Sequence, residues 1–324
     1  MHWECRHPKQ IPREQWLDWL TATSDPSPYL LPEWGLFWEA IWPDARAEAW
    51  VLSDDTGRAH AVIPVTRRRR LGWEMCHAQP FGTPCGPLTP NGHAHGEELG
   101  GFMLAAIGPR TVEFACHPDL GAPPGRWTKQ TLRNDVWQLQ LEGDISRPRR
   151  GYSESHRRNI RRGEELQPRL SDLESAADVT RLLSTWKDRG RPSRIVLVPQ
   201  PAGAMMELFA PTGALRFRVA WVGDRPAAVA VFLVHRDHAV YVDGAFDREP
   251  RFQGVGHWLF AETLSALRRE GVRVVNLGGG AAGDSGAGLA QFKHGWGAEP
   301  AAVHTAVYRR PWYHALHTLF RPRG

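Results

Sequence analysis

The stretch Pro250 to Phe260, PRFQGVGHWLF, combines a basic residue, two glycines and a following apolar run. Phosphate binding at a turn requires outward-pointing backbone N–H groups, glycines that let the backbone approach the ligand, and a helix N-terminus behind them. Gly254 and Gly256 would allow that approach, and Arg251 would add a charge-assisted hydrogen bond. The pattern predicts a phosphate-binding turn, although a glycine pair before a helix also occurs in ordinary surface turns.

A second group of residues that could bind anions lies between Arg147 and Arg162, RPRRGYSESHRRNIRR. It contains seven arginines and one glutamate, a local charge of +6 in a chain whose formal net charge is +5. On a helix, Arg157 and Arg161 are four residues apart, a repulsive spacing unless an anion is near. Two interpretations remain open: a substrate-binding patch of Arg157, Arg158 and Arg161, or a solvated face on which Glu165 compensates Arg161.

The second half of the chain contains the elements that would position the turn. Leu215–Val222, Ala227–His235 and Ala239–Ala245 are predicted strands with hairpin-length connections, which indicates an antiparallel meander. The other elements expected in this half are helices at Ser155–Leu166, Leu173–Lys187 and Ala202–Phe209, a strand at Val272–Leu277, a short helix through Phe292 and a strand near Ala301–Tyr308.

The residues after Gly256 predict an amphipathic helix that Gly271 would end. Its expected apolar face consists of Leu259, Phe260, Thr263, Leu264 and Leu267.

The first half is predicted to be a separate domain. Arg13–Leu20 and Glu33–Trp42 indicate helices, and Ala47–Val65 indicates two strands joined by a hairpin. The stretch Leu141–Gly151 has turn residues and charge without apolar periodicity, so we place the domain connection there. The expected domains are residues 1–145 and 146–324, and further strands are expected at Thr111–Cys116 and Asn134–Leu141.

Composition limits the class of protein. The chain has 324 residues, 42% of them hydrophobic and 23% charged, which is typical of a folded protein. No secretory signal is visible at the N-terminus, and the longest apolar stretch, Pro226–Val234, is about half as long as a membrane span. The four cysteines have no CxxC spacing, so we expect neither a disulfide framework nor a metal site, and a cytoplasmic location.

The turn resembles the phosphate-binding signature of the Gcn5-related N-acetyltransferase (GNAT) superfamily, Arg/Gln-x-x-Gly-x-Gly/Ala, through Arg251, Gly254 and Gly256. The element order from Leu215 to Tyr308 is also similar to that fold. This resemblance implies that the turn from Arg251 to Gly256, including Gln253 and Val255, binds the pyrophosphate of coenzyme A. It further implies that the first half is a degenerate copy of the same fold.

A narrower resemblance is to the FemAB-like transferases, double-GNAT proteins that build peptidoglycan cross-bridges, and to their acetyltransferase relatives. The segments SESHRRNIRRGEE, YVDGAFD, VNLGGG and GLAQFKHGWG carry it. In bridge-building members the donor is aminoacyl-tRNA, and a Phe-Lys pair matching Phe292 and Lys293 lies at the active centre. This chain has no long charged heptad segment for a coiled-coil arm, and its turn is closer to that of coenzyme A users.

The resemblance implies catalytic roles for three residues. Lys293, one of only four lysines, would stabilise the oxyanion that develops when an amine attacks an acyl carbonyl. Asp243 would accept a proton from that amine, or would only hydrogen-bond the following glycine turn. Phe292 stands beside Lys293, and core packing is the alternative role for its ring.

We therefore expect an α/β protein of two GNAT-like (acyl-CoA N-acyltransferase) domains, with mixed, mostly antiparallel sheets flanked by helices. The expected activity is acyl transfer, with acetyl-CoA or another acyl-CoA as co-substrate, to an amine on a small molecule or a cell-wall precursor. One alternative is aminoacyl-tRNA-dependent transfer to a peptidoglycan precursor. The other is a catalytically silent protein that binds an anionic partner.

Overall fold

The computed structural model describes residues 1–23, 26–70, 73–77, 87–88, 111–116, 129–141, 151–186, 198–279 and 284–308. The chain forms two compact units. The first comprises Met1–Asn134 and Ala302–Gly324, and the second comprises Asp135–Ala301. Residues 142–150 of the connection expected at Leu141–Gly151 lie outside the described residues. The division between the two units precedes Asp135 and Ala302.

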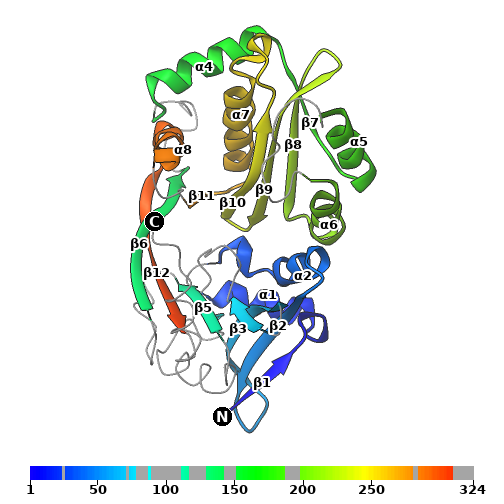
Figure 1. Ribbon diagram of the computed structural model, residues 1–324, viewed down its shortest axis with the longest axis vertical. Coiled ribbons are helices and arrows are strands. Elements are labelled where there is room, and N and C mark those ends of the chain that lie inside the picture. The colour runs from blue at the N-terminus through cyan, green and yellow to red at the C-terminus, as the bar shows by residue number, and fades with distance from the viewer. Residues whose placement is uncertain are drawn as a thin grey trace. The chain divides into compact units, whose positions relative to one another are not determined.

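In the first unit, neighbouring strands are hydrogen-bonded in the order β1-β2-β3-β4-β5-β12 (Figure 1). Neighbouring strands are antiparallel except β4 and β5, which are parallel. The strands are β1 (His2–Arg6), β2 (Ala45–Ser53), β3 (Ala59–Arg70), β4 (Trp73–His77), β5 (Thr111–Cys116) and β12 (Glu299–Tyr308), and the helices are α1 (Arg13–Ala22), α2 (Pro32–Ile41) and the 3-10 turns η1 (Pro8–Gln10) and η2 (Pro28–Leu30).

Aromatic side chains and ion pairs stabilise this unit. Helix α2 places Trp34, Phe37 and Trp38 on one buried face, as expected for residues three and four positions apart. In β3, the Nε atom of Arg67 lies 2.6 Å from the Oε1 atom of Glu48 on β2. Asp44 similarly pairs with Arg68. The basic run of β3 is thus partly neutralised inside the first unit.

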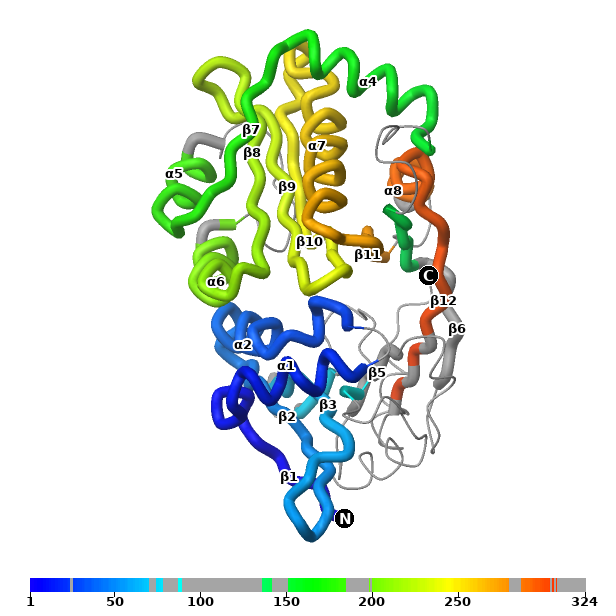
Figure 2. Tube along the Cα trace, turned by 180° about the vertical axis from the view of Figure 1, so that it is seen from behind, coloured from blue at the N-terminus to red at the C-terminus, as the bar shows by residue number. Residues whose placement is uncertain are grey.

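In the second unit, neighbouring strands are hydrogen-bonded in the order β6-β11-β10-β9-β8-β7. The predicted meander is confirmed, because β8, β9 and β10 run side by side and antiparallel (Figure 2). Strand β11 is parallel to β10 and antiparallel to β6. The strands are β6 (Lys129–Gln140), β7 (Arg169–Asp172), β8 (Leu215–Val222), β9 (Arg225–His235), β10 (His238–Phe246) and β11 (Val274–Gly279).

Helices α4 and α7 pack against each other, with α4 crossing the N-terminal end of α7 (Figures 1 and 2). Ser153 caps α4, because its Oγ atom accepts a hydrogen bond from the backbone N–H of His156. The helices of this unit are α4 (Glu154–Glu165), α5 (Ala176–Trp186), α6 (Pro199–Phe209), α7 (Val255–Arg269) and α8 (Asp284–Gly295), with 3-10 turns η6 (Ala210–Thr212) and η7 (Pro250–Phe252).

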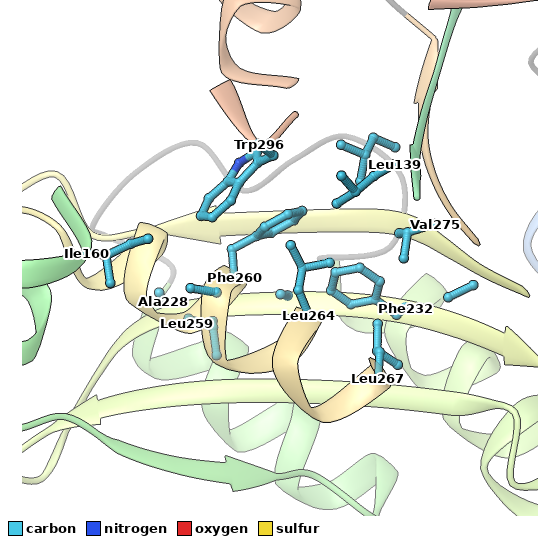
Figure 3. Close-up of a cluster of buried hydrophobic side chains, with 14 of the residues drawn as sticks. Leu139, Ile160, Ala228, Phe232, Leu259, Phe260, Leu264, Leu267, Val275 and Trp296 are labelled. Atoms are coloured by element: carbon cyan, nitrogen blue, oxygen red, sulfur yellow. The ribbon is translucent and has the colours of Figure 1, made fainter. Parts of the chain in front are cut away.

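The core of the second unit lies between α7 and the sheet (Figure 3). Every residue of the predicted apolar face of α7 is buried. Each large aliphatic or aromatic side chain buried in this way stabilises the fold by roughly 1.5–3 kcal/mol. Phe260 packs against Trp296, which follows α8, with ring centroids 4.8 Å apart. This packing fixes the start of α7 relative to α8.

None of the helices in the described ranges is both long enough and apolar enough to cross a membrane. Strands β1, β4 and β7 were not expected from the sequence. Each has only four or five residues, too few for a convincing alternation of apolar and polar side chains.

Candidate active site

Strand β10 separates from β11 partway along its length. Pairs between the two strands extend only from His238 with Val274 to Val240 with Asn276. The ladder between β10 and β9 shifts register between Tyr241 and Asp243, the signature of a β-bulge, and then continues to Phe246. The second half of β10 is therefore available to a ligand on the side away from β9.

A cavity of about 690 Å³ lies in the second unit beside this part of β10. Its floor includes Ala228 and Ala230 of β9 and Gly244 of β10. Because these residues are small, the floor leaves space that larger side chains would fill. The walls come from three parts of the chain that are far apart in the sequence: Asn159 of α4, the consecutive elements η7 and α7 with Phe252, Gly256 and His257, and Phe292 of α8.

The predicted phosphate-binding turn borders this cavity. Gln253, Gly254 and Gly256 line it, and α7 begins at Val255. Among the described residues, nothing accepts a hydrogen bond from the backbone N–H groups of residues 254 to 257. These are the unpaired amides of a helix start, which can bind an anion. Val255 has a fully buried side chain, so only its backbone can face a ligand.

Arg251 does not line the cavity. Its Nε atom lies 2.7 Å from the Oε2 atom of Glu249, and 56% of its side chain is exposed. The guanidinium also stacks on Phe252, with its central carbon 4.8 Å from the ring centroid. The motif's arginine is therefore already paired with a carboxylate.

Gly254 has a role that the sequence did not indicate. Its φ of +96° favours glycine, and a Cβ atom there would collide with the carbonyl oxygen of Asn159 and lie 2.7 Å from the backbone nitrogen of Gly163. The missing side chain thus makes room for α4 as well as for a ligand. At Gly256, by contrast, the three atoms nearest to a Cβ atom would all belong to the side chain of Phe246, the first at 3.2 Å.

Lys293 and Asp243 are both buried, 3% and 4% exposed, and neither lines the cavity. The Nζ atom of Lys293 donates hydrogen bonds of 2.7 Å to the carbonyl oxygens of Gly278 and Gly279 at the end of β11. Lys293 is therefore not a surface lysine. The Oδ1 atom of Asp243 accepts a 2.9 Å hydrogen bond from the N–H of Gly244.

Phe292 lines the cavity and belongs to an aromatic cluster with Phe260, Trp296, His156 and His257. The Nε2 atom of His156 lies 3.0 Å from the carbonyl oxygen of Phe292, which can only accept, so Nε2 donates. A Cβ atom on Gly295 would collide with the imidazole of His156. His156 thus ties α4 to α8 beside the Phe-Lys pair.

His156 and His257 were missed by the sequence analysis. Their rings meet edge to face with centroids 4.8 Å apart, and His257 lines the cavity. Burial lowers the pKa of His257 to about 4, with a further contribution from His156, and burial also lowers the pKa of His156. Both imidazoles are therefore neutral at pH 7. The available signal was their position inside the two motifs, SESHRRN and GVGHWLF.

The three arginines assigned to substrate binding lie on α4 with exposed side chains, outside the cavity lining. Arg157 donates a 2.8 Å hydrogen bond to the carbonyl oxygen of Tyr152. Arg158 and Arg161 have no carboxylate partner among the described residues, so Glu165 does not compensate Arg161. Among all the residues that the structure describes, no group of three or more His, Cys, Asp or Glu side chains could hold a metal ion.

Comparison with known proteins agrees with this geometry. Residues 150–294 match the family described as acetyltransferase (GNAT) domain. The fold is similar to that of FemX, with a TM-score of 0.70 and 11% identity, and the similarity covers 98% of this chain and 99% of the FemX chain. No curated protein sequence matches.

Two further solved structures have similar folds. L-PGS from Bacillus licheniformis has a TM-score of 0.54 at 12% identity, with 96% of each chain covered. A tandem GNAT protein from the clavulanic acid biosynthesis pathway has a TM-score of 0.51 at 14% identity, covering 94% of this chain and 98% of the other. The predicted α/β architecture, with sheets flanked by helices, is confirmed.

Proposed function

Because residues 150–294 match the GNAT acetyltransferase domain family and the fold of the chain is similar to that of FemX, this protein is an acyltransferase, and we propose that it moves an acyl group from acyl-coenzyme A to an amine. The observation that carries the proposal is the cavity at the start of α7. Its polar end is lined by the turn whose amides are unpaired, and its interior is mostly apolar. Such a site suits a donor with phosphates at one end and an apolar arm at the other.

The phosphates would lie at Gln253–Gly256, where helix N–H groups and the helix dipole favour negative charge. The arm of the donor would follow β10 past Gly244, where that strand no longer pairs with β11. Exposed Phe246 and Leu289 at the cavity support this assignment, because an arm lying over them would remove their surface from water.

The proposed chemistry is direct attack without a covalent enzyme intermediate. The amine nitrogen attacks the thioester carbonyl, a C–N bond forms, and the carbonyl oxygen becomes negative. The C–S bond then breaks, and the departing thiolate takes up a proton while the nitrogen loses one. We assign Phe292 to the wall beside the acyl group. Lys293 and Asp243 do not line the cavity, so the oxyanion-stabilising and proton-accepting roles expected for them require their side chains to turn toward the acyl group from behind the lining.

The test is calorimetric titration of coenzyme A into wild type and Gly256→Val. The new side chain would press on Phe246 at the cavity and disturb the amide contacts, and a hydrogen bond to a charged group contributes roughly 1.5–3 kcal/mol. Affinity should therefore fall at least about tenfold. Gly203→Val in α6 is the matched control, because nothing lies within 4 Å of a Cβ atom there. A wild type that neither binds coenzyme A nor acylates any amine would contradict the proposal.

A second candidate, aminoacyl-tRNA-dependent transfer to a peptidoglycan precursor, is favoured by one observation: the similarity to FemX extends over nearly the whole of both chains. The arginines of α4 would then contact tRNA phosphates. Thermal denaturation with coenzyme A or charged tRNA separates the candidates, because a ligand of the folded state raises the melting temperature. Stabilisation by an anion without any turnover would instead favour the silent binding protein. Both candidate donors are found in the cytoplasm, where we place the protein.

A further inference from the structure

Helices α4 and α7 approach each other closely at a pair of glycines. A Cβ atom on Gly163 would lie 2.6 Å from the carbonyl oxygen of Gly254 and 2.8 Å from the Cβ atom of Trp258. A Cβ atom on Gly254 would in turn reach the backbone of α4. The backbones can therefore meet only because both positions are glycine, and α4 lies directly beside the phosphate-binding turn.

The contact between α4 and α7 places the arginines of α4 at different distances from the turn. The Cβ atom of Arg162 lies 3.1 Å from the position of a Cβ atom on Gly254, so its side chain starts beside the turn. Arg158 is one helical turn before Arg162 and on the same side. Arg161 is about 200° around the helix from Gly163 and so faces away from α7, and Arg157 donates a hydrogen bond to the carbonyl oxygen of Tyr152.

The arginines of α4 form no ion pair within the described protein. By contrast, Arg67, Arg216 and Arg225 each pair with a glutamate. Arg158 and Arg162, four residues apart, repel each other unless an anion lies between them. Arg251, the arginine that the motif assigns to phosphate, is held by Glu249.

We propose that Arg162, with Arg158 behind it, binds the diphosphate of the acyl donor beside Gly254, in the role that the motif gives to Arg251. This inference rests on the proposed function. A guanidinium donates to two phosphate oxygens at once, and it adds charge next to the unpaired amides of α7. The donor is thereby held from two sides, by α7 and by α4.

The test compares Arg162→Ala with Arg161→Ala, which removes the same charge from the neighbouring position on the far side of α4. Calorimetry with coenzyme A should show affinity reduced about tenfold or more by Arg162→Ala, for the loss of one charged contact, and changed less than about twofold by Arg161→Ala. Arg162→Lys should restore part of the loss. The side chains of Arg161 and Arg162 are both exposed, so the three variants should fold.

Dephospho-coenzyme A, which lacks the 3′-phosphate, shows which phosphate is bound: Arg162→Ala should weaken it by the same factor. If Arg162→Ala weakened the binding of coenzyme A but not that of dephospho-coenzyme A, the assignment of Arg162 to the diphosphate would be overturned. The inference would be overturned if Arg162→Ala and Arg161→Ala lost the same affinity for coenzyme A, or if Arg162→Ala lost only tRNA binding. In both cases the wild type would still bind coenzyme A. A wild type that binds no coenzyme A refutes the proposed function itself.

Discussion

At the scale of single residues, His156 positions the Phe-Lys pair. Its imidazole reaches the carbonyl oxygen of Phe292 at one nitrogen and the Oγ atom of Ser153, 3.0 Å away, at the other. Because Phe292 lines the cavity and Lys293 follows it, a change at His156 is transmitted to both.

We expect His156→Ala to lower kcat for acyl transfer while changing the affinity for coenzyme A little. The variant removes the hydrogen bond between α4 and α8, whereas the turn at Gly254 keeps its contact with Gly163 of α4. Steady-state kinetics and calorimetry measure the two effects. His156→Gln, which can still donate to the carbonyl, should recover part of the rate. Equal effects on rate and donor affinity would show that His156 supports the whole fold instead.

His257 gives the protein an acid-sensitive stability. Its pKa is about 4 in the folded protein and about 6.5 when unfolded, so the unfolded state binds more protons between these values. The free energy of unfolding should therefore fall as pH decreases from about 6.5 toward 4. Melting temperatures across this range should drop less steeply for His257→Gln than for wild type. Parallel curves would exclude His257 as a cause.

At the scale of elements, the crossing of α4 and α7 depends on Gly163. We expect Gly163→Ala to destabilise the protein by about 1–3 kcal/mol, because its Cβ atom would overpack against Gly254 and Trp258. Urea denaturation measures the change. Gly203→Ala, in α6 where space is open, should be neutral or slightly stabilising. If both variants have the same stability, the close approach is not required.

The sequence predicted elements better than contacts between elements. The meander, α7 and the glycine-containing turn before it follow from local periodicity and glycine placement, which the chain displays within a few residues. The pairing of Gly163 with Gly254 joins segments far apart in sequence, and no local pattern reveals it. The burial of Lys293 also escaped prediction, because its partners are backbone carbonyls that any residue provides.

At the scale of the whole molecule, the first unit contains a strand from near the C-terminal end of the chain. The part of β12 that comes after the second unit pairs with β5 of the first, from His304 with Cys116 to Tyr308 with Val112. Deleting residues 302–324 should therefore raise hydrogen exchange in β5 while β8, β9 and β10 keep their protection, because their partners remain. Loss of protection throughout would mean that the units unfold together.

The same arrangement makes the second unit an insertion within the first, since the chain leaves the first unit after Asn134 and returns to it at Ala302. A ribosome synthesising this protein completes the acyltransferase unit before it releases the last strand of the unit that began earlier. Domains usually fold in the order in which they are made. Here we expect that order to be reversed: the unit made first waits, incomplete, until the inserted one has emerged.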